Sequence, residues 1–266
     1  MTVLDIGRVR LNVERLGDVD RPVVVLVHGL TAGSLASYYF SVAGRLAAAG
    51  HCVVMYDQRG HGRSERPHTG YRLEEFTADL VALLDVLGVD RPFSLVGECF
   101  GGAVAMDFAA RYPHRLTGLA LIECPLPTGA WARGLVGLLA QGAELTRDAQ
   151  AIDRIGREHG RFAARAVRRS RPLLLDTTLL EEVADSRTRE EDDWSSLDVP
   201  VLALYGGDST LVGNAPVMER VLPHCRTVVI PGHGHQVLVD ARESVGPLLV
   251  DWALEGRRRQ EGTPTP

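Results

Sequence analysis

The chain has 266 residues, 45% of them hydrophobic, and a formal net charge of −5, a composition that suits one large globular domain with an insert. The negative charge argues against the basic surface typical of nucleic-acid-binding proteins. The longest apolar runs, such as 22–27 and 201–205, are too short to cross a bilayer, and charged residues among the first 17 argue against a signal peptide, so we predict a cytoplasmic location.

Short apolar runs and amphipathic segments take turns along most of the chain. The alternating segments 3–9 and 10–16 predict an antiparallel hairpin at a sheet edge. Continuous apolar runs, typical of strands buried on both faces, follow at 22–28, 52–56, 92–96, 116–123, 201–205 and 226–230. Segments with helical character lie at 41–49, 73–87, 101–111, 216–222 and 242–254. This order predicts an α/β fold with a mostly parallel, doubly wound sheet.

One long stretch, residues 128–195, has helical character but no strand pattern, and we call it the insert. Trp131, Leu135 and Leu139 suit one helix face, and 161–170 suits a second helix. Because the insert separates two core strands, we expect a helical cap over the carboxyl edge of the sheet. Open α/β sheets bind their ligands at that edge, so the cap would shape the pocket.

The insert divides the predicted core into two segments, 1–127 and 196–256. Residues 257–266, with three arginines and two prolines, are predicted to form a flexible tail. The insert also carries five closely spaced arginines, which could bind an acidic carrier protein or a carboxylated substrate: Arg161, Arg165, Arg168, Arg169 and Arg171. All 29 basic residues of the chain are arginines, so a solvated helix face is the favoured interpretation.

The motif with the clearest chemistry is Gly-Glu-Cys-Phe-Gly-Gly at 97–102, directly between a predicted strand and a predicted helix. It has the form of a nucleophile elbow, G-x-nucleophile-x-G, with Cys99 in the usual serine position. The helix that follows directs its positive N-terminal end at Cys99, which favours a thiolate and an oxyanion. A buried structural cysteine in a glycine-rich turn is the alternative. Glu98 is expected to pack or hydrogen-bond locally.

The sequence resembles the α/β-hydrolase superfamily at this elbow, at the Val-His-Gly-Leu-Thr segment 27–31 and in the loop 56–64. The resemblance covers nearly all of the chain outside the insert. It implies that the backbone amides of Leu30 and Phe100 form the oxyanion hole. It also makes His61, in the loop 56–64, a structural turn residue.

The same resemblance implies the other two members of a catalytic triad. Asp208 follows the strand after the insert, where the family places the carboxylate that orients the histidine. Glu123, at the end of the preceding strand, is the rival acid. His235 ends the Gly-His-Gly-His segment 232–235 and is predicted to be the general base, with His233 as the alternative. We prefer the triad Cys99, His235 and Asp208.

These residues predict an enzyme that acts on an ester, lactone or thioester through an acyl-Cys99 intermediate, by hydrolysis, cyclisation or acyl transfer. The elbow is similar to those of dienelactone hydrolases and of cysteine-type thioesterases, and a role in bacterial secondary metabolism would fit. The alternatives are a lyase that eliminates a carboxylate and a non-catalytic ligand-binding protein on the same scaffold. We expect a small-molecule acyl substrate, free or bound to a carrier protein, and no nucleic-acid or membrane partner. Neither a cofactor nor a metal is predicted, since the four cysteines have no metal-ligand spacing.

Overall fold

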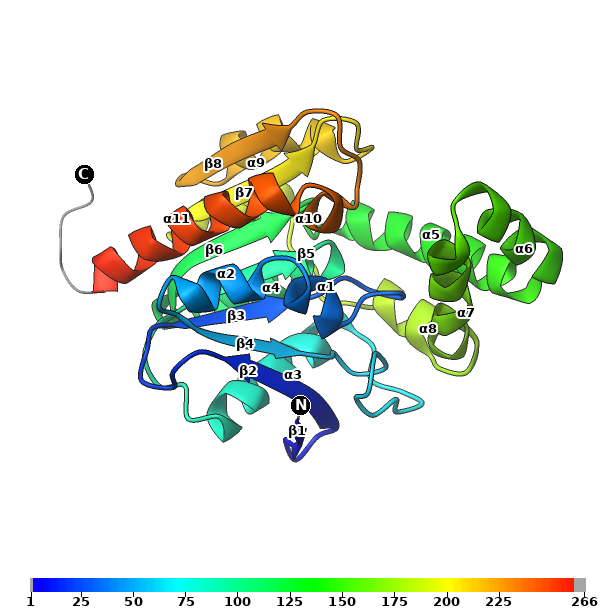
Figure 1. The fold of residues 1–266 in the computed structure, drawn as a ribbon, viewed down its shortest axis with the longest axis horizontal. Coiled ribbons are helices and arrows are strands. Elements are labelled where there is room, and N and C mark those ends of the chain that lie inside the picture. Colours follow the sequence, from blue (N-terminus) through cyan, green and yellow to red (C-terminus); the bar gives the residue numbers. More distant parts are fainter. Residues whose placement is uncertain (1, 261–266) are drawn as a thin grey trace.

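The computed structural model describes residues 2–260 and contains one eight-stranded sheet with helices on both faces (Figure 1). The strands are β1 (Thr2–Asp5), β2 (Arg10–Leu16), β3 (Val23–Val27), β4 (Cys52–Tyr56), β5 (Phe93–Glu98), β6 (Leu116–Ile122), β7 (Val201–Gly206) and β8 (Cys225–Ile230). They are arranged in the order β1-β2-β4-β3-β5-β6-β7-β8. β2 pairs antiparallel with β1 and β4, and all remaining pairs are parallel. The predicted α/β class, the edge hairpin and the doubly wound sheet are therefore confirmed.

The central strands are apolar throughout because both of their faces are covered. Val25 and Val27 of β3 belong to one buried cluster, and Val24 and Leu26 to the other, as the two-residue period of a strand requires. The first cluster is covered by α3 (Leu73–Val86), α4 (Phe100–Arg111) and α9 (Ala215–Val221). The second is covered by α1 (Leu35–Tyr39), α2 (Ala43–Ala48), α10 (Val237–Asp240) and α11 (Arg242–Gln260). The short helices α1 and α10 were not predicted from the sequence pattern.

The insert lies between β6 and β7 and extends beyond the carboxyl edge of the sheet (Figure 1). It contains α5 (Gly129–Arg147), α6 (Ala149–Glu158), α7 (Arg161–Leu175), α8 (Leu179–Ala184) and a 3-10 helix, Glu191–Ser196. The Glu182 carboxylate of α8 accepts hydrogen bonds from the backbone amides of Gly70 and Tyr71. These bonds fix the insert to the loop that precedes α3.

The C-terminal helix is longer than predicted. α11 continues to Gln260, so the first residues of the segment predicted as a flexible tail are helical. Residues 261–266 lie outside the described part of the chain. No helix among the described residues is long and apolar enough to span a membrane.

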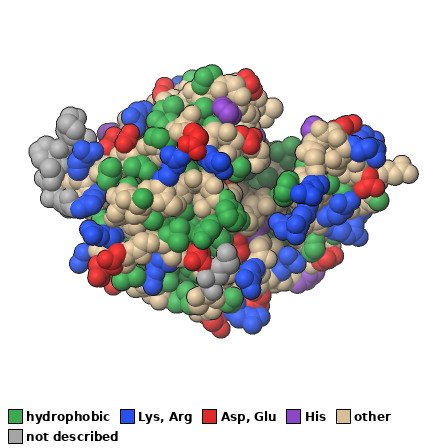
Figure 2. Space-filling view, viewed as in Figure 1, with side chains coloured by type: hydrophobic (Ala, Val, Ile, Leu, Met, Phe, Trp, Pro, Cys, Tyr) green, Lys and Arg blue, Asp and Glu red, His purple; other side chains and the backbone are tan. Residues whose placement is uncertain are grey.

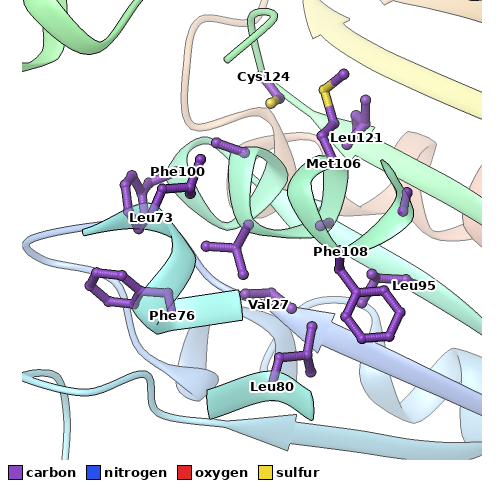
Figure 3. Close-up of a cluster of buried hydrophobic side chains, with 14 of the residues drawn as sticks. Val27, Leu73, Phe76, Leu80, Leu95, Phe100, Met106, Phe108, Leu121 and Cys124 are labelled. Carbon is purple, nitrogen blue, oxygen red and sulfur yellow. The ribbon is translucent and has the colours of Figure 1, made fainter. Parts of the chain in front are cut away.

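A buried aromatic cluster beneath the elbow joins the site to the core. Phe100, the first residue of α4, packs its ring edge-on against Phe76 with centroids 4.9 Å apart. The ring of Trp131, from the insert, stacks on Phe100 at 6.1 Å. Figure 3 shows Phe100 beside Leu73 and above Phe76. Burying such side chains contributes about 1.5–3 kcal/mol each, so this cluster holds α4 at a fixed height above the sheet.

Close packing of α4 on β3 leaves no space for a side chain at Gly101. A Cβ atom there would lie 2.2 Å from the Val27 carbonyl oxygen and 2.5 Å from that of His28. We therefore expect Gly101→Ala to lower the free energy of unfolding by about 1–3 kcal/mol in urea denaturation, because α4 must move away from the sheet.

Gly134→Ala is the matched control. Gly134 lies on the exposed face of α5, and nothing lies within 4 Å of its added Cβ. Alanine is the better helix former, so this variant should gain up to about 1 kcal/mol. Equal stability changes for the two variants would contradict the close packing at the elbow.

Candidate active site

The elbow places Cys99 between the end of β5 and the start of α4. Its backbone has φ +51°, and its amide donates a hydrogen bond to the Ile122 carbonyl of β6 at 2.8 Å. A Cβ atom on Gly97 would lie 2.4 Å from the Gly101 carbonyl oxygen, so the turn requires glycine there. The tight turn leaves the Cys99 side chain on the wall of a pocket. The predicted strand–turn–helix context of Cys99 is thus present.

Backbone strain is concentrated at this edge of the sheet. Among the described residues, the non-glycine residues with positive φ are Thr31, Cys99 and Glu123, at +64°, +51° and +52°. They follow β3, β5 and β6, which are adjacent strands. Such conformations cost about 1–3 kcal/mol each and persist at sites where the surrounding structure enforces them. Their clustering marks this edge as the candidate site.

His235 reaches Cys99 from the loop between β8 and α10. Its Nδ1 lies 3.1 Å from Oε2 of Glu123, which leaves Nε2 for the hydrogen bond to Cys99. The hydrogen bonds to Cys99 and then to Glu123 outweigh burial and raise the pKa of His235 to about 10. The imidazole side chain is still 42% exposed, so solvent reaches its edge. His235, and not the alternative His233, is the histidine that the fold brings to the cysteine.

Glu123 is the carboxylate that contacts this histidine. Its side chain is completely buried, and Oε1 accepts a hydrogen bond from the Gly206 amide at 2.6 Å. The Ser209 hydroxyl donates to Oε2, the same oxygen that faces His235. Burial acts to raise the pKa of Glu123, but the bonds from His235, Ser209 and Gly206 together hold it below its usual value.

The structure does not bring the carboxylate of Asp208, which we predicted to orient His235, into contact with that histidine. The Asp208 amide donates to the His233 carbonyl at 2.9 Å, but its side chain is exposed to solvent. Glu123 extends from the neighbouring strand beneath the histidine loop and occupies the position beside Nδ1. The rival acid considered from the sequence is therefore the one in contact. Sequence reasoning missed Ser209, and its place next to Asp208 gives no hint that it would support Glu123.

The two amides predicted as oxyanion donors lie at the same site. Leu30 lines the pocket that contains Cys99, and Phe100 is the first residue of α4. Neither amide donates to a protein acceptor within the part of the chain that the structure describes. The loop that carries Leu30 is held by His28, whose Nδ1 donates to the Gly29 carbonyl while Nε2 accepts from the Gln58 amide at 3.0 Å. Two free amides therefore stand beside the cysteine, as an oxyanion hole requires.

The pocket next to Cys99 has a volume of about 520 Å³ and two dissimilar sides. Thr31, Ser34, Glu98 and His235 line the side formed by the core. Helices α5 and α7 of the insert form the other side, which is mainly apolar: Leu135, Leu138, Leu139, Leu145, Ala166, Val167 and Leu174. The insert thus borders the reacting atoms with a hydrophobic wall.

The other candidate side chains serve the core. His61 is buried and its Nδ1 bonds to the Arg59 carbonyl, consistent with the predicted structural turn residue. Burial raises the pKa of the Cys52, Cys124 and Cys225 thiols. Within residues 2–260 no group of three or more His, Cys, Asp or Glu side chains is placed to hold a metal ion.

The sheet order, the elbow and the histidine loop together define an α/β-hydrolase. The model of the alpha/beta hydrolase fold family matches residues 22–241, and the chain belongs to this family. Over 250 residues it is 27% identical to 2-(acetamidomethylene)succinate hydrolase of Mesorhizobium japonicum, a match that covers 88% of each chain. It is 39% identical over 123 residues to epoxide hydrolase B of Mycobacterium tuberculosis, across 46% of this chain and 33% of that one. A thermophilic esterase from Thermogutta terrifontis superimposes with a TM-score of 0.77 at 24% identity, over 93% of this chain and 94% of that one.

The contact between Glu123 and His235 can be tested without a substrate. Glu123→Gln keeps the shape of the side chain but removes the charge that favours imidazolium. We expect the NMR titration midpoint of His235 to fall from about 10 by roughly one unit, and Cys99 alkylation by iodoacetamide to slow, because the imidazolium loses the carboxylate that stabilises it.

Asp208→Asn is the control for this experiment, because it removes one carboxylate from the adjacent strand end without touching the histidine. Its titration midpoint and alkylation rate should match those of the unmodified protein. The assignment of Glu123 is overturned by the reverse pattern, in which Asp208→Asn shifts the midpoint and Glu123→Gln does not.

Proposed function

We propose that the protein cleaves esters or thioesters through an acyl intermediate on Cys99 and passes the acyl group to water or to a bound acceptor. The observation that carries this proposal is the hydrogen-bonded series from Cys99 to His235 to the buried Glu123, beside two unpaired amides. This arrangement supports acyl transfer with Cys99 as nucleophile, His235 as base and Glu123 as orienting carboxylate.

The raised pKa of His235 favours an imidazolium at neutral pH. A thiol beside an imidazolium and a helix N-terminus reacts more readily as a nucleophile, because both favour the negative charge on sulfur. Such a pair differs from a serine–histidine pair, in which the proton moves only as the bond to carbon forms. A proton is already on the histidine, ready for the leaving group.

Each half of the reaction balances with these groups alone. The thiolate attacks the carbonyl carbon, and the oxyanion that forms is bound by the amides of Leu30 and Phe100. The C–O or C–S bond of the substrate breaks, and the leaving alkoxide or thiolate takes the proton from His235. Water or the acceptor then gives a proton to the neutral His235 as it attacks the Cys99 thioester. Collapse of the second oxyanion releases the product and restores the thiolate–imidazolium pair.

The apolar wall supplied by the insert supports an acyl group with a hydrophobic part. Leu135, Leu139 and Leu174 border the pocket on the side opposite Thr31 and Ser34. An acceptor held between these sides would reach the thioester at a high effective concentration and compete with water. The cysteine assists such transfer, because a thioester reacts with amines, alcohols and thiols more readily than an ester does.

The covalent step can be detected by intact-mass spectrometry. After exposure to an acyl thioester of N-acetylcysteamine or a p-nitrophenyl ester, the protein should gain the mass of one acyl group, with the modified peptide containing Cys99. The acylated protein is then incubated in buffer alone, with an alcohol or with an amine. Release of the free acid indicates hydrolysis, and release of the ester or amide indicates acyl transfer.

Cys99→Ala should lose both the adduct and turnover. Cys225→Ala, which removes a half-buried thiol whose pKa burial raises to about 12, should keep both. The proposal fails if Cys99→Ala turns over these substrates at the rate of the unmodified protein, or if no acyl adduct forms while turnover proceeds.

A further inference from the structure

Glu98 is a second carboxyl group at the site, and the triad does not use it. It precedes the nucleophile and lines the same pocket as Cys99 and His235. From the sequence we expected it to bond locally, and it does hydrogen-bond to the backbone of Gly29. That bond engages only part of a carboxylate that can accept several. The side chain is half-buried, so its remaining acceptor capacity faces the pocket.

Among residues 2–260, no arginine lines the pocket around Glu98, and the sequence contains no lysine. Within the same residues, His235 is the one lining group that can be cationic, and it is already bonded to Cys99 and to Glu123. With Glu98 ionised, the two carboxylates Glu98 and Glu123 outnumber the one imidazolium. A half-buried carboxylate without a cation or further donors of its own is poorly compensated, so a ligand that brings a donor would be favoured there.

We propose that Glu98 binds a hydrogen-bond donor of the substrate, an ammonium or hydroxyl group carried close to the acyl carbon, and that it disfavours substrates with an anionic group at that position. This inference rests on the proposed function and adds the substrate class to it. The apolar wall of the insert would take the rest of the acyl chain, and Glu98 would fix the polar substituent beside the nucleophile. The relative from Mesorhizobium is named for a succinate, a dianionic compound, so the two proteins would differ in the charge they accept.

Four matched thioesters of N-acetylcysteamine test this proposal: butyryl, 3-hydroxybutyryl, 3-aminobutyryl and 3-sulfobutyryl. They differ only in the group on carbon 3. For the unmodified protein we expect the hydroxy or the amino substrate to have a kcat/KM about ten times or more above butyryl, and the sulfo substrate to fall below it. We expect a difference of this size because removing one partner of a hydrogen bond to a charged group typically changes binding by about tenfold or more.

Glu98→Gln keeps the size and loses the charge. This variant should lower kcat/KM for the amino substrate by about 10- to 100-fold. It should change kcat/KM for the butyryl substrate by no more than about threefold and increase kcat/KM for the sulfo substrate. Glutamine can still accept from a hydroxyl group, so a hydroxy preference that survives in this variant identifies a neutral ligand. An amino preference that disappears identifies a cationic one. Glu181→Gln, which removes one exposed carboxylate from α8 outside the pocket, should leave all four ratios unchanged.

The charge of Glu98 also gives the ratio of amino to butyryl substrate a pH dependence. Burial, the largest influence, raises the pKa of Glu98 to about 7, with Glu123 acting in the same direction and His235 and the Gly29 bond acting against it. The carboxylate forms as pH rises through that value, so the ratio should increase from pH 6 to pH 8. Cys99, His235, Glu123 and Tyr38 also act on this region, but their own ionisation affects both substrates and largely cancels in the ratio.

The possible failures can be distinguished. If Glu98→Gln lowers kcat/KM for all four substrates by the same factor, the side chain has only a structural role and the inference is overturned. An acyl-Cys99 adduct in the same experiment would leave the proposed function intact. Iodoacetamide labelling of Cys99 in Glu98→Gln at the unmodified rate would establish that the variant retains its site. If no thioester forms an adduct in either protein, the proposed function itself fails.

Discussion

The hydrogen bond between Glu123 and His235 is the interaction on which the geometry of the site depends. It joins the end of β6 to the loop after β8, across β7, whose last residue and following serine also bond to the same carboxylate. One buried side chain therefore connects three strand ends. If this carboxylate moved, the histidine would lose its orientation toward Cys99, and the end of β7 and the loop after it would each lose one hydrogen bond.

The carboxylate and the imidazole also support each other electrostatically. The pKa of Glu123 is lowered in the folded protein. The stability that Glu123 adds is therefore present at pH values above its pKa in the unfolded chain, and it is lost as pH falls through its pKa in the folded protein. The pKa of His235 is raised to about 10 in the folded protein. The stability that His235 adds is therefore fully present at pH values below its pKa in the unfolded chain, near 6.5, and it is lost as pH rises through about 10. The pair is thus ionised together across the neutral range, where the proposed chemistry needs an imidazolium.

Much of the fold could be predicted because the signals are local. Apolar runs of strand length, amphipathic helices and the elbow glycines each depend on a few adjacent residues, and in most cases the ends of the predicted elements lie within two residues of the observed ends. Cys99 and His235 stand in short motifs, so they were also found. The choice between Asp208 and Glu123 could not be made in this way, since both follow buried strands and only the side-chain path decides which one reaches Nδ1. Helices α1 and α10, of five and four residues, are too short to show a periodic pattern.

The packing of Phe100 links the proposed oxyanion donor to the insert. Its amide has no protein acceptor among the described residues, while its ring is held between Phe76 of α3 and Trp131 of the insert. The same residue therefore sets the height of that amide and contacts the element that forms the apolar wall of the pocket. A change in the insert that shifts Trp131 would be transmitted to the Phe100 backbone through a rigid, close-packed contact. Arginines gather on the outer surface of the insert (Figure 2), so the insert combines a charged exterior with an apolar wall facing Cys99. Its inner face therefore has to fit both the proposed acyl group and the packing around Phe100, whereas its outer face meets neither constraint.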